Sequence, residues 1–170
     1  MNSEAFFKLT YGLYVVSSLH QGKKNGFIAN SVFQVTSEPA QIAVVCHKNN
    51  FTSAMITESK VFSVSVLEKD VQPKLIGLFG YKSGNKEDKF AKTGHIEGKT
   101  GVPIVVEDTV AWFECELVQA FDVGTHTIFI GQIIENALLA DDKIPLTYAY
   151  YRDIKKGKAP ANAPTYIKPS

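Results

Sequence analysis

The stretch GFIANSVFQVTSEPAQIAVVCHKNNFTSAMITES, residues 26–59, carries the pattern from which the fold of this chain is predicted. Residues 26–35 and 41–47 are runs of strand type, rich in β-branched and other apolar residues. The turn formers Thr-Ser-Glu-Pro at residues 36–39 separate them. The stretch therefore predicts two strands joined by a turn.

After the polar residues 47–50, the apolar spacing changes from two residues to three and four, which is the period of a helix. One face of that helix would carry four residues, three of them apolar: Phe51, Ala54, Met55 and Glu58. Asn49 or Asn50 would serve as the N-cap. The pattern predicts a short amphipathic helix directly after the second strand.

The start of this helix has the composition of an anion site. The first N–H groups of a helix lack partners within it, and Thr52, Ser53 and Lys48 would add hydroxyls and a positive charge. The same residues also fit an ordinary strand–loop–helix unit that binds nothing. Spacing alone leaves both interpretations open.

The rest of the chain reads mainly as strands. Strand-like runs occupy residues 11–19, 61–67, 110–118 and 126–134, and two shorter strands surround the turn at residues 98–101. Residues 61–67 alternate strictly and predict a half-buried strand, while Glu114 and Glu116 predict a solvated strand face. Residues 71–80 predict a helix with Pro73 in its first turn and an apolar stripe made by Val71, Leu75, Ile76 and Phe79.

Many short strands without strand–helix–strand alternation predict a mainly β fold, a closed antiparallel barrel with a few short peripheral helices. We expect one domain over residues 1–152 and an extended C-terminal tail over residues 153–170, which is rich in Lys, Ala and Pro. Tyr148, Tyr150 and Tyr151 either form a wall beside a planar cofactor or lie on a strand that closes the barrel.

Composition excludes several classes of function. A net charge of +1 without a basic block argues against a nucleic-acid partner, and no apolar run is long enough to span a membrane. No cluster of ligands at metal spacing occurs. Cys46 and Cys115 both lie in apolar runs, which predicts buried free thiols and a reducing, cytoplasmic location.

Several segments together resemble the flavin reductase-like family. The resemblance covers about residues 6–166 and rests on NGFIANS (25–31), SEP (37–39), CHKN (46–49), Thr52 and FSVSVL (62–67). The C-terminal segment, residues 148–166, is most similar to the branch of the family that works with rubredoxin. The resemblance implies a split β-barrel of Greek-key-like topology that binds FMN near a homodimer interface.

The resemblance also implies a set of cofactor-binding residues. Backbone groups of four residues would contact the isoalloxazine: Ala29, Asn30, Ser31 and Val32. The phosphate and ribityl chain would be held by Lys48, Asn49 and Thr52, with Lys89 as a further candidate. The predicted FMN site also includes Cys46, His47 and Tyr151.

His126 is the candidate catalytic residue. The segment GTHTIFIG at residues 124–131 resembles the Gly-Asp-His-x-x-x-x-Gly pattern of flavin reductases, in which the histidine lies on the nicotinamide side of the flavin. Thr125 replaces the usual acidic residue. From the residues alone, a lone strand-end histidine is usually a surface or capping residue.

The expected function is therefore that of an FMN-binding oxidoreductase. Reducing equivalents would pass from NAD(P)H to FMN and then to a flavin or protein acceptor. One alternative is an electron-transfer module with tightly bound FMN that serves a rubredoxin-type partner without oxidising NAD(P)H. Another is a barrel that binds flavin or protein without catalysis. The sequence does not choose between NADH and NADPH.

Overall fold

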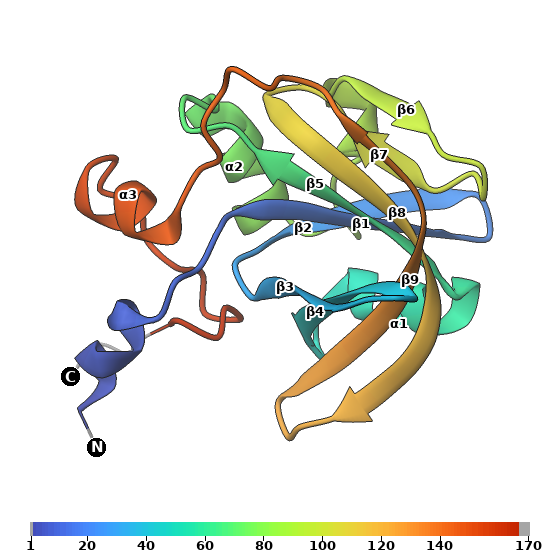
Figure 1. Ribbon diagram of the computed structural model, residues 1–170, viewed down its shortest axis with the longest axis horizontal. Coiled ribbons are helices and arrows are strands. Elements are labelled where there is room, and N and C mark those ends of the chain that lie inside the picture. Colours follow the sequence, from blue (N-terminus) through green and yellow to red (C-terminus); the bar gives the residue numbers. More distant parts are fainter. Residues whose placement is uncertain (1, 167–170) are drawn as a thin grey trace.

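A seven-stranded antiparallel sheet organises the computed structural model, which describes residues 2–166 (Figure 1). The strands lie in the order β2-β1-β5-β8-β9-β4-β3. Their bounds are β1 (Tyr14–His20), β2 (Lys23–Ala29), β3 (Val32–Ser37), β4 (Ala40–His47), β5 (Val61–Leu67), β8 (Thr109–Asp122) and β9 (His126–Leu138). A separate hairpin consists of β6 (His95–Glu97) and β7 (Pro103–Val105). The helices are η1 (Ser3–Lys8), α1 (Phe51–Ser59), α2 (Pro73–Tyr81), η2 (Phe90–Lys92) and α3 (Tyr148–Asp153).

The sheet curls into a barrel around one apolar core. Every one of its strands contributes a buried side chain to a single cluster, as does Ile56 of α1. The two edge strands take part through Phe27 and Ala29 on β2 and Val32 on β3. Because the edges and the centre of the sheet share this core, the inner face is closed on itself. The predicted mainly β, antiparallel barrel is confirmed.

Helix α2 covers the outer face of the barrel near β1 and β2. Its predicted apolar stripe is buried, with Leu75, Ile76 and Phe79 packed in a second apolar cluster beside Leu13 and Val15. Pro73 occupies the start of the helix, where its missing N–H leaves no bond unmade. The helix prediction for residues 71–80 is confirmed apart from its first two residues.

The boundaries of β2 and β3 differ from the sequence prediction. Residues 26–35 form two strands, interrupted at Asn30 and Ser31. The interruption has a physical reason, because the chain leaves the ladder with β1 at Ala29 and starts the ladder with β4 at Val32. Between them, the buried Asn30 side chain donates to Thr165 Oγ1 at 2.7 Å. The hairpin turn between β1 and β2 is short. Gln21 and Gly22 alone make the turn, both with positive φ.

The predicted apolar face of α1 is wrong. Asn50 is the N-cap, and its side chain accepts from Thr52 N, but Ala54 and Glu58 are exposed. The buried residues are Thr52, Ser53, Met55 and Ile56. A polar side chain occupies this interface because Asn25 Nδ2 donates to Thr52 Oγ1 at 3.0 Å. Apolar spacing alone does not reveal such a satisfied polar contact.

Two solvated faces predicted from alternation are buried instead. Ser63 and Ser65 of β5 are inaccessible, and Ser63 Oγ donates to Pro103 O of β7 at 2.6 Å. Glu114 is 0 % exposed, whereas Glu116 is exposed as predicted. The predictions for β5 and Glu114 fail because the β6–β7 hairpin covers the outer face of the sheet there (Figure 1).

The C-terminal tyrosines lie on a helix. Residues 148–153 form α3, so the interpretation of a barrel-closing strand is wrong. In Figure 1 this helix lies beside the barrel, on the same side as η1. Cys46 and Cys115 are buried and free, and burial raises the pKa of each thiol to about 12. No helix among residues 2–166 is both long and apolar enough to cross a membrane.

Candidate functional site

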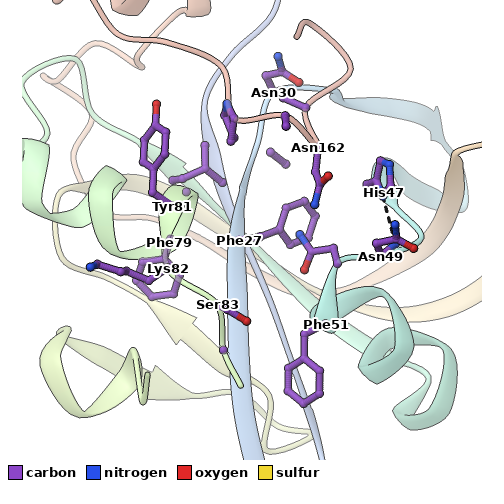
Figure 2. A pocket seen from close by; sticks show the side chains of 18 of the residues that line it. Phe27, Asn30, His47, Asn49, Phe51, Phe79, Tyr81, Lys82, Ser83 and Asn162 are labelled. Carbon is purple, nitrogen blue, oxygen red and sulfur yellow. Dashed lines mark hydrogen bonds between the residues drawn. The ribbon is translucent and has the colours of Figure 1, made fainter. Parts of the chain in front are cut away.

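A cleft of about 550 Å³ opens between β2, the start of α1, the end of α2 and the C-terminal segment (Figure 2). Phe27 of β2 lies at its centre. In Figure 2, Tyr81, Lys82 and Ser83 stand on one side of Phe27, and His47 and Asn49 stand on the other. Residues 160–164 and Tyr166 form a further wall. Four segments that are distant in sequence therefore meet at one site.

Lys89 supplies a buried positive charge to this cleft. Its side chain donates from Nζ to Gly26 O at 2.8 Å and to Phe79 O at 3.4 Å, and the residue is only 2 % exposed. No carboxylate of the described chain lies within ion-pair distance of it. Burial lowers the pKa of Lys89 to about 8. An ammonium held this way favours an anionic ligand.

The start of α1 differs from the anion site that its sequence suggests. Lys48 Nζ forms an ion pair with Asp122 at 2.5 Å, beside the β8–β9 hairpin. Thr52 is fully buried and bonds to Asn25, and its N–H is already occupied by the Asn50 cap. Asn49 lines the cleft, and its N–H donates to His47 Nδ1 at 3.1 Å. The positive charge at the cleft therefore comes from Lys82 and Lys89.

His126 lies at the rim of the cleft, paired with His47. The two rings pack edge to face at 4.8 Å, because the residues are partners in the β4–β9 ladder. His126 Nδ1 bonds to Thr125 Oγ1 at 2.8 Å, and Nε2 bonds to Asn162 O at 3.3 Å. Burial and then the neighbouring His47 lower the pKa of His126, against the raising effect of the Asn162 carbonyl. A neutral imidazole that donates from Nε2 satisfies all of these contacts.

The structure brings five of the predicted FMN residues to the cleft: Ala29, Asn30, His47, Asn49 and Lys89. His126 joins them through its contacts to His47 and Asn162. Ser31 lies at the turn after Asn30, to whose Oδ1 its hydroxyl donates at 3.3 Å.

The other predicted FMN residues lie outside the lining of this cleft. Val32 and Cys46 face the barrel core. Lys48 and Thr52 have the partners described above. Tyr151 lines a small apolar recess with Tyr148 and Lys158, and burial, ahead of its contact with Tyr81, raises its pKa.

Sequence reasoning missed several lining residues. They are Asn25, Phe27, Phe79, the loop residues 81–84 and the tail residues 160–164 with Tyr166. Asn25 and Phe27 lie inside the segment that carries the family resemblance, so a signal for them was present. The loop carries no motif. The tail residues belong to the C-terminal segment that resembles the rubredoxin-associated branch, but only the folded chain brings the loop and the tail to the site.

Comparisons with known proteins match this architecture. The model of the "Flavin reductase like domain" family matches residues 6–156. The chain is 46 % identical over 168 residues to a ferric-chelate reductase (NAD(P)H) of Archaeoglobus fulgidus, covering 99 % of each chain. It is 43 % identical over 166 residues to a high molecular weight rubredoxin of Moorella thermoacetica, covering 98 % of this chain and 72 % of the other.

A solved FMN-binding protein of Thermus thermophilus has a similar fold, with a TM-score of 0.71 and 25 % identity over 77 % of this chain and 72 % of the other. These matches confirm the predicted resemblance, the split-barrel fold and the oxidoreductase class, with FMN as cofactor and NAD(P)H as electron donor. They do not favour the alternative of a carrier that leaves NAD(P)H untouched. The chain belongs to the flavin reductase-like family of flavoprotein oxidoreductases.

Proposed function

We propose that this chain holds FMN in the cleft at β2, accepts a hydride from NAD(P)H there, and passes electrons on to an external acceptor. The cleft carries this proposal, since its apolar centre at Phe27 suits a flat ring system and its buried Lys89 suits a phosphate. Bound FMN would supply the hydride-accepting ring. The chain's own residues would position it and keep water out.

The residues present fit FMN. Ala29, Asn30, His47 and Asn49 are proposed to contact the cofactor, together with the backbone at Ser31 and Val32. For the phosphate, the geometry supports Lys89 and Lys82 over Lys48, which already pairs with Asp122. The Asn25 carboxamide adds a buried polar group without a full set of partners. A ligand with an apolar ring and a polar, anionic chain matches this distribution.

His126 is proposed to position the incoming nicotinamide. Its place at the rim, outside the lining of the cleft, supports a role toward a second ligand instead of toward FMN itself. A neutral imidazole with both nitrogens engaged is held in one orientation.

The names of two relatives support two classes of acceptor. The relative from Archaeoglobus fulgidus is named for ferric-chelate reduction, and the one from Moorella thermoacetica for rubredoxin. We propose a ferric chelate or a rubredoxin-type protein as the electron acceptor, with free flavin as a third candidate acceptor. We also propose a homodimer in the cytoplasm, the latter because both cysteines are free.

Anaerobic stopped-flow absorbance tests the function. Purified protein is titrated with FMN, and the bound flavin is then mixed with NADH or NADPH. The proposal expects saturable FMN binding and rapid bleaching by at least one nicotinamide. Protein that takes up no FMN would refute it. Bound FMN that bleaches with dithionite but not with either nicotinamide would support the carrier instead.

A further inference from the structure

Asn25 of β2 carries a polar group that the folded chain leaves unused at the cleft. The residue is 2 % exposed and lines the cleft. Its Nδ2 donates to Thr52 Oγ1, while its Oδ1 has no partner within residues 2–166. Turning the amide over exchanges the two atoms but still leaves one end free, because Thr52 engages only one of them.

The surroundings fix this amide in place. Gly84 lies against it so closely that a Cβ at position 84 would stand 2.2 Å from Asn25 Oδ1. Lys89 Nζ bonds to the carbonyl of Gly26, the residue after Asn25. An unpartnered amide end and a buried ammonium thus line the same cleft, anchored at adjacent residues of β2. Buried polar groups without partners are unfavourable, which points to a ligand that completes them.

The chemistry of the amide selects the group that it would bind. A free Oδ1 needs a donor and a free Nδ2 needs an acceptor, and a hydroxyl can serve as either. In the orientation that the structure shows, Oδ1 is the free atom, and a dianionic phosphate has no donor to offer to it. Within a flavin nucleotide, hydroxyls occur on the ribityl chain, which connects the ring to the phosphate. That position agrees with a phosphate near Lys89.

We propose that Asn25 recognises the hydroxyl-bearing chain of the flavin and thereby selects flavins with a ribityl chain over the bare ring system. This inference rests on the proposed FMN function. Asn25 would act as a specificity-determining residue through one hydrogen bond to a ribityl hydroxyl. Lys89 would act separately on the phosphate.

A ligand series tests the assignment. FMN, riboflavin and lumiflavin share the ring, riboflavin lacks the phosphate, and lumiflavin lacks the whole ribityl chain. In Asn25→Leu, which keeps the size but removes the amide, the dissociation constants of FMN and riboflavin should rise roughly tenfold. That of lumiflavin should stay within about twofold. Lys89→Met should weaken FMN but spare riboflavin.

Gly84→Ala provides a second route to the same answer, because its methyl group would displace the amide without removing it. It should weaken FMN and riboflavin more than lumiflavin, and it carries the test if Asn25→Leu fails to fold. Equal weakening of all three flavins, or unchanged FMN binding in the variants, would overturn the assignment. Wild-type protein that binds no flavin would refute the proposed function itself.

Discussion

At the scale of single residues, His126 shows how much of a side chain's role comes from its contacts. The resemblance of residues 124–131 to the family pattern made His126 the candidate catalytic residue, and the sequence already shows Thr125 in place of the usual acidic residue. The consequence required the structure. The Thr125 hydroxyl and the Asn162 carbonyl hold a neutral ring, and Asn162 is 36 residues away from His126 in the sequence.

Replacing His126 by Ala should separate hydride transfer from cofactor binding. The FMN dissociation constant should stay within about twofold, since the histidine lies at the rim. Flavin reduction by NAD(P)H should slow roughly ten- to a hundredfold, because a positioning residue acts on the reacting geometry. Stopped-flow reduction by dithionite, which needs no nicotinamide site, is the control. Loss of FMN would assign His126 to the cofactor site, and an unchanged rate would make it a surface residue.

Lys89 should link FMN binding to proton uptake. Its pKa near 8 lies below the usual 10.5, so between these values the free protein holds fewer protons than the unfolded chain. Through this group, the stability of the free protein should therefore rise with pH across that window. A bound phosphate favours the ammonium and raises the pKa again, so binding near pH 9 should take up as much as about one proton.

Calorimetry in two buffers of different ionisation enthalpy measures this uptake. Lys89→Met should abolish it and weaken FMN binding by about 1.5–3 kcal/mol, the range for a charge-assisted bond. Lys48→Ala is the matched control, because Lys48 pairs with Asp122 outside the cleft. Proton uptake on FMN binding that persists in Lys89→Met, or that disappears in Lys48→Ala, would show that another lysine binds the phosphate.

At the scale of elements, periodicity found the strands and helices but not all of their faces. It predicted α2 with its apolar stripe and the long strands β8 and β9. It failed where polar side chains are buried and satisfied, as Thr52 is by Asn25 and as Glu114 is by the turn between β6 and β7. Such contacts join residues far apart in sequence. The alternation of apolar and polar residues within one strand therefore does not indicate them.

Glu114 should contribute far more to stability than its neighbour Glu116. Its buried carboxylate accepts from Lys99 N at 2.9 Å and from Thr100 N and Oγ1 at 2.7 Å each. Glu114→Gln replaces one acceptor oxygen by a donor and should lower the free energy of unfolding by about 1.5–3 kcal/mol. Glu116→Gln, on the exposed face of the same strand, should change it by at most about 0.5 kcal/mol. Urea denaturation that finds equal effects would contradict this.

The C-terminal segment should be anchored by the bond between Asn30 and Thr165. Both side chains are buried, and the bond measures 2.7 Å. Thr165→Val removes the acceptor and leaves the Asn30 amide unpaired, which costs about 1–3 kcal/mol. Limited proteolysis within residues 157–164 should accelerate roughly tenfold or more as the segment opens locally. Thr165→Ser keeps the hydroxyl and should resemble the wild type, and equal cleavage of all three proteins would argue against this anchor.

At the scale of the whole molecule, the barrel was predictable but the cleft was not. Strand frequency and the absence of strand–helix–strand units already favoured an antiparallel barrel. The cleft is formed by β2, the start of α1, the loop after α2 and residues 160–166. No local sequence pattern indicates that these segments meet. The division into a domain at residues 1–152 and a tail remains a prediction, although residues beyond 152 contribute a wall of the site.

The surface of the barrel also bears on its assembly. Phe33 on the edge strand β3 is 55 % exposed, and Phe121 near the tip of the β8–β9 hairpin is 49 % exposed. Val35 and Val118 extend this apolar surface on the same two elements. An unprotected edge strand with apolar side chains is a ready surface for pairing with another chain. We therefore expect this half of the sheet to form the homodimer interface.

Sedimentation velocity should give the mass of a dimer for the wild type, and that of a monomer for the double variant Phe33→Glu and Phe121→Glu. In the dimer, each new carboxylate would be buried in an apolar interface without a partner. The free-energy cost of this desolvation is large enough to dissociate the dimer. Leu138→Glu is the control. Leu138 is 65 % exposed, more than Phe33, but it lies at the opposite end of β9 from the hairpin tip. It should remain a dimer. A wild-type monomer that still binds FMN, or a double variant that stays dimeric while retaining its circular dichroism spectrum, would place the interface elsewhere or remove it.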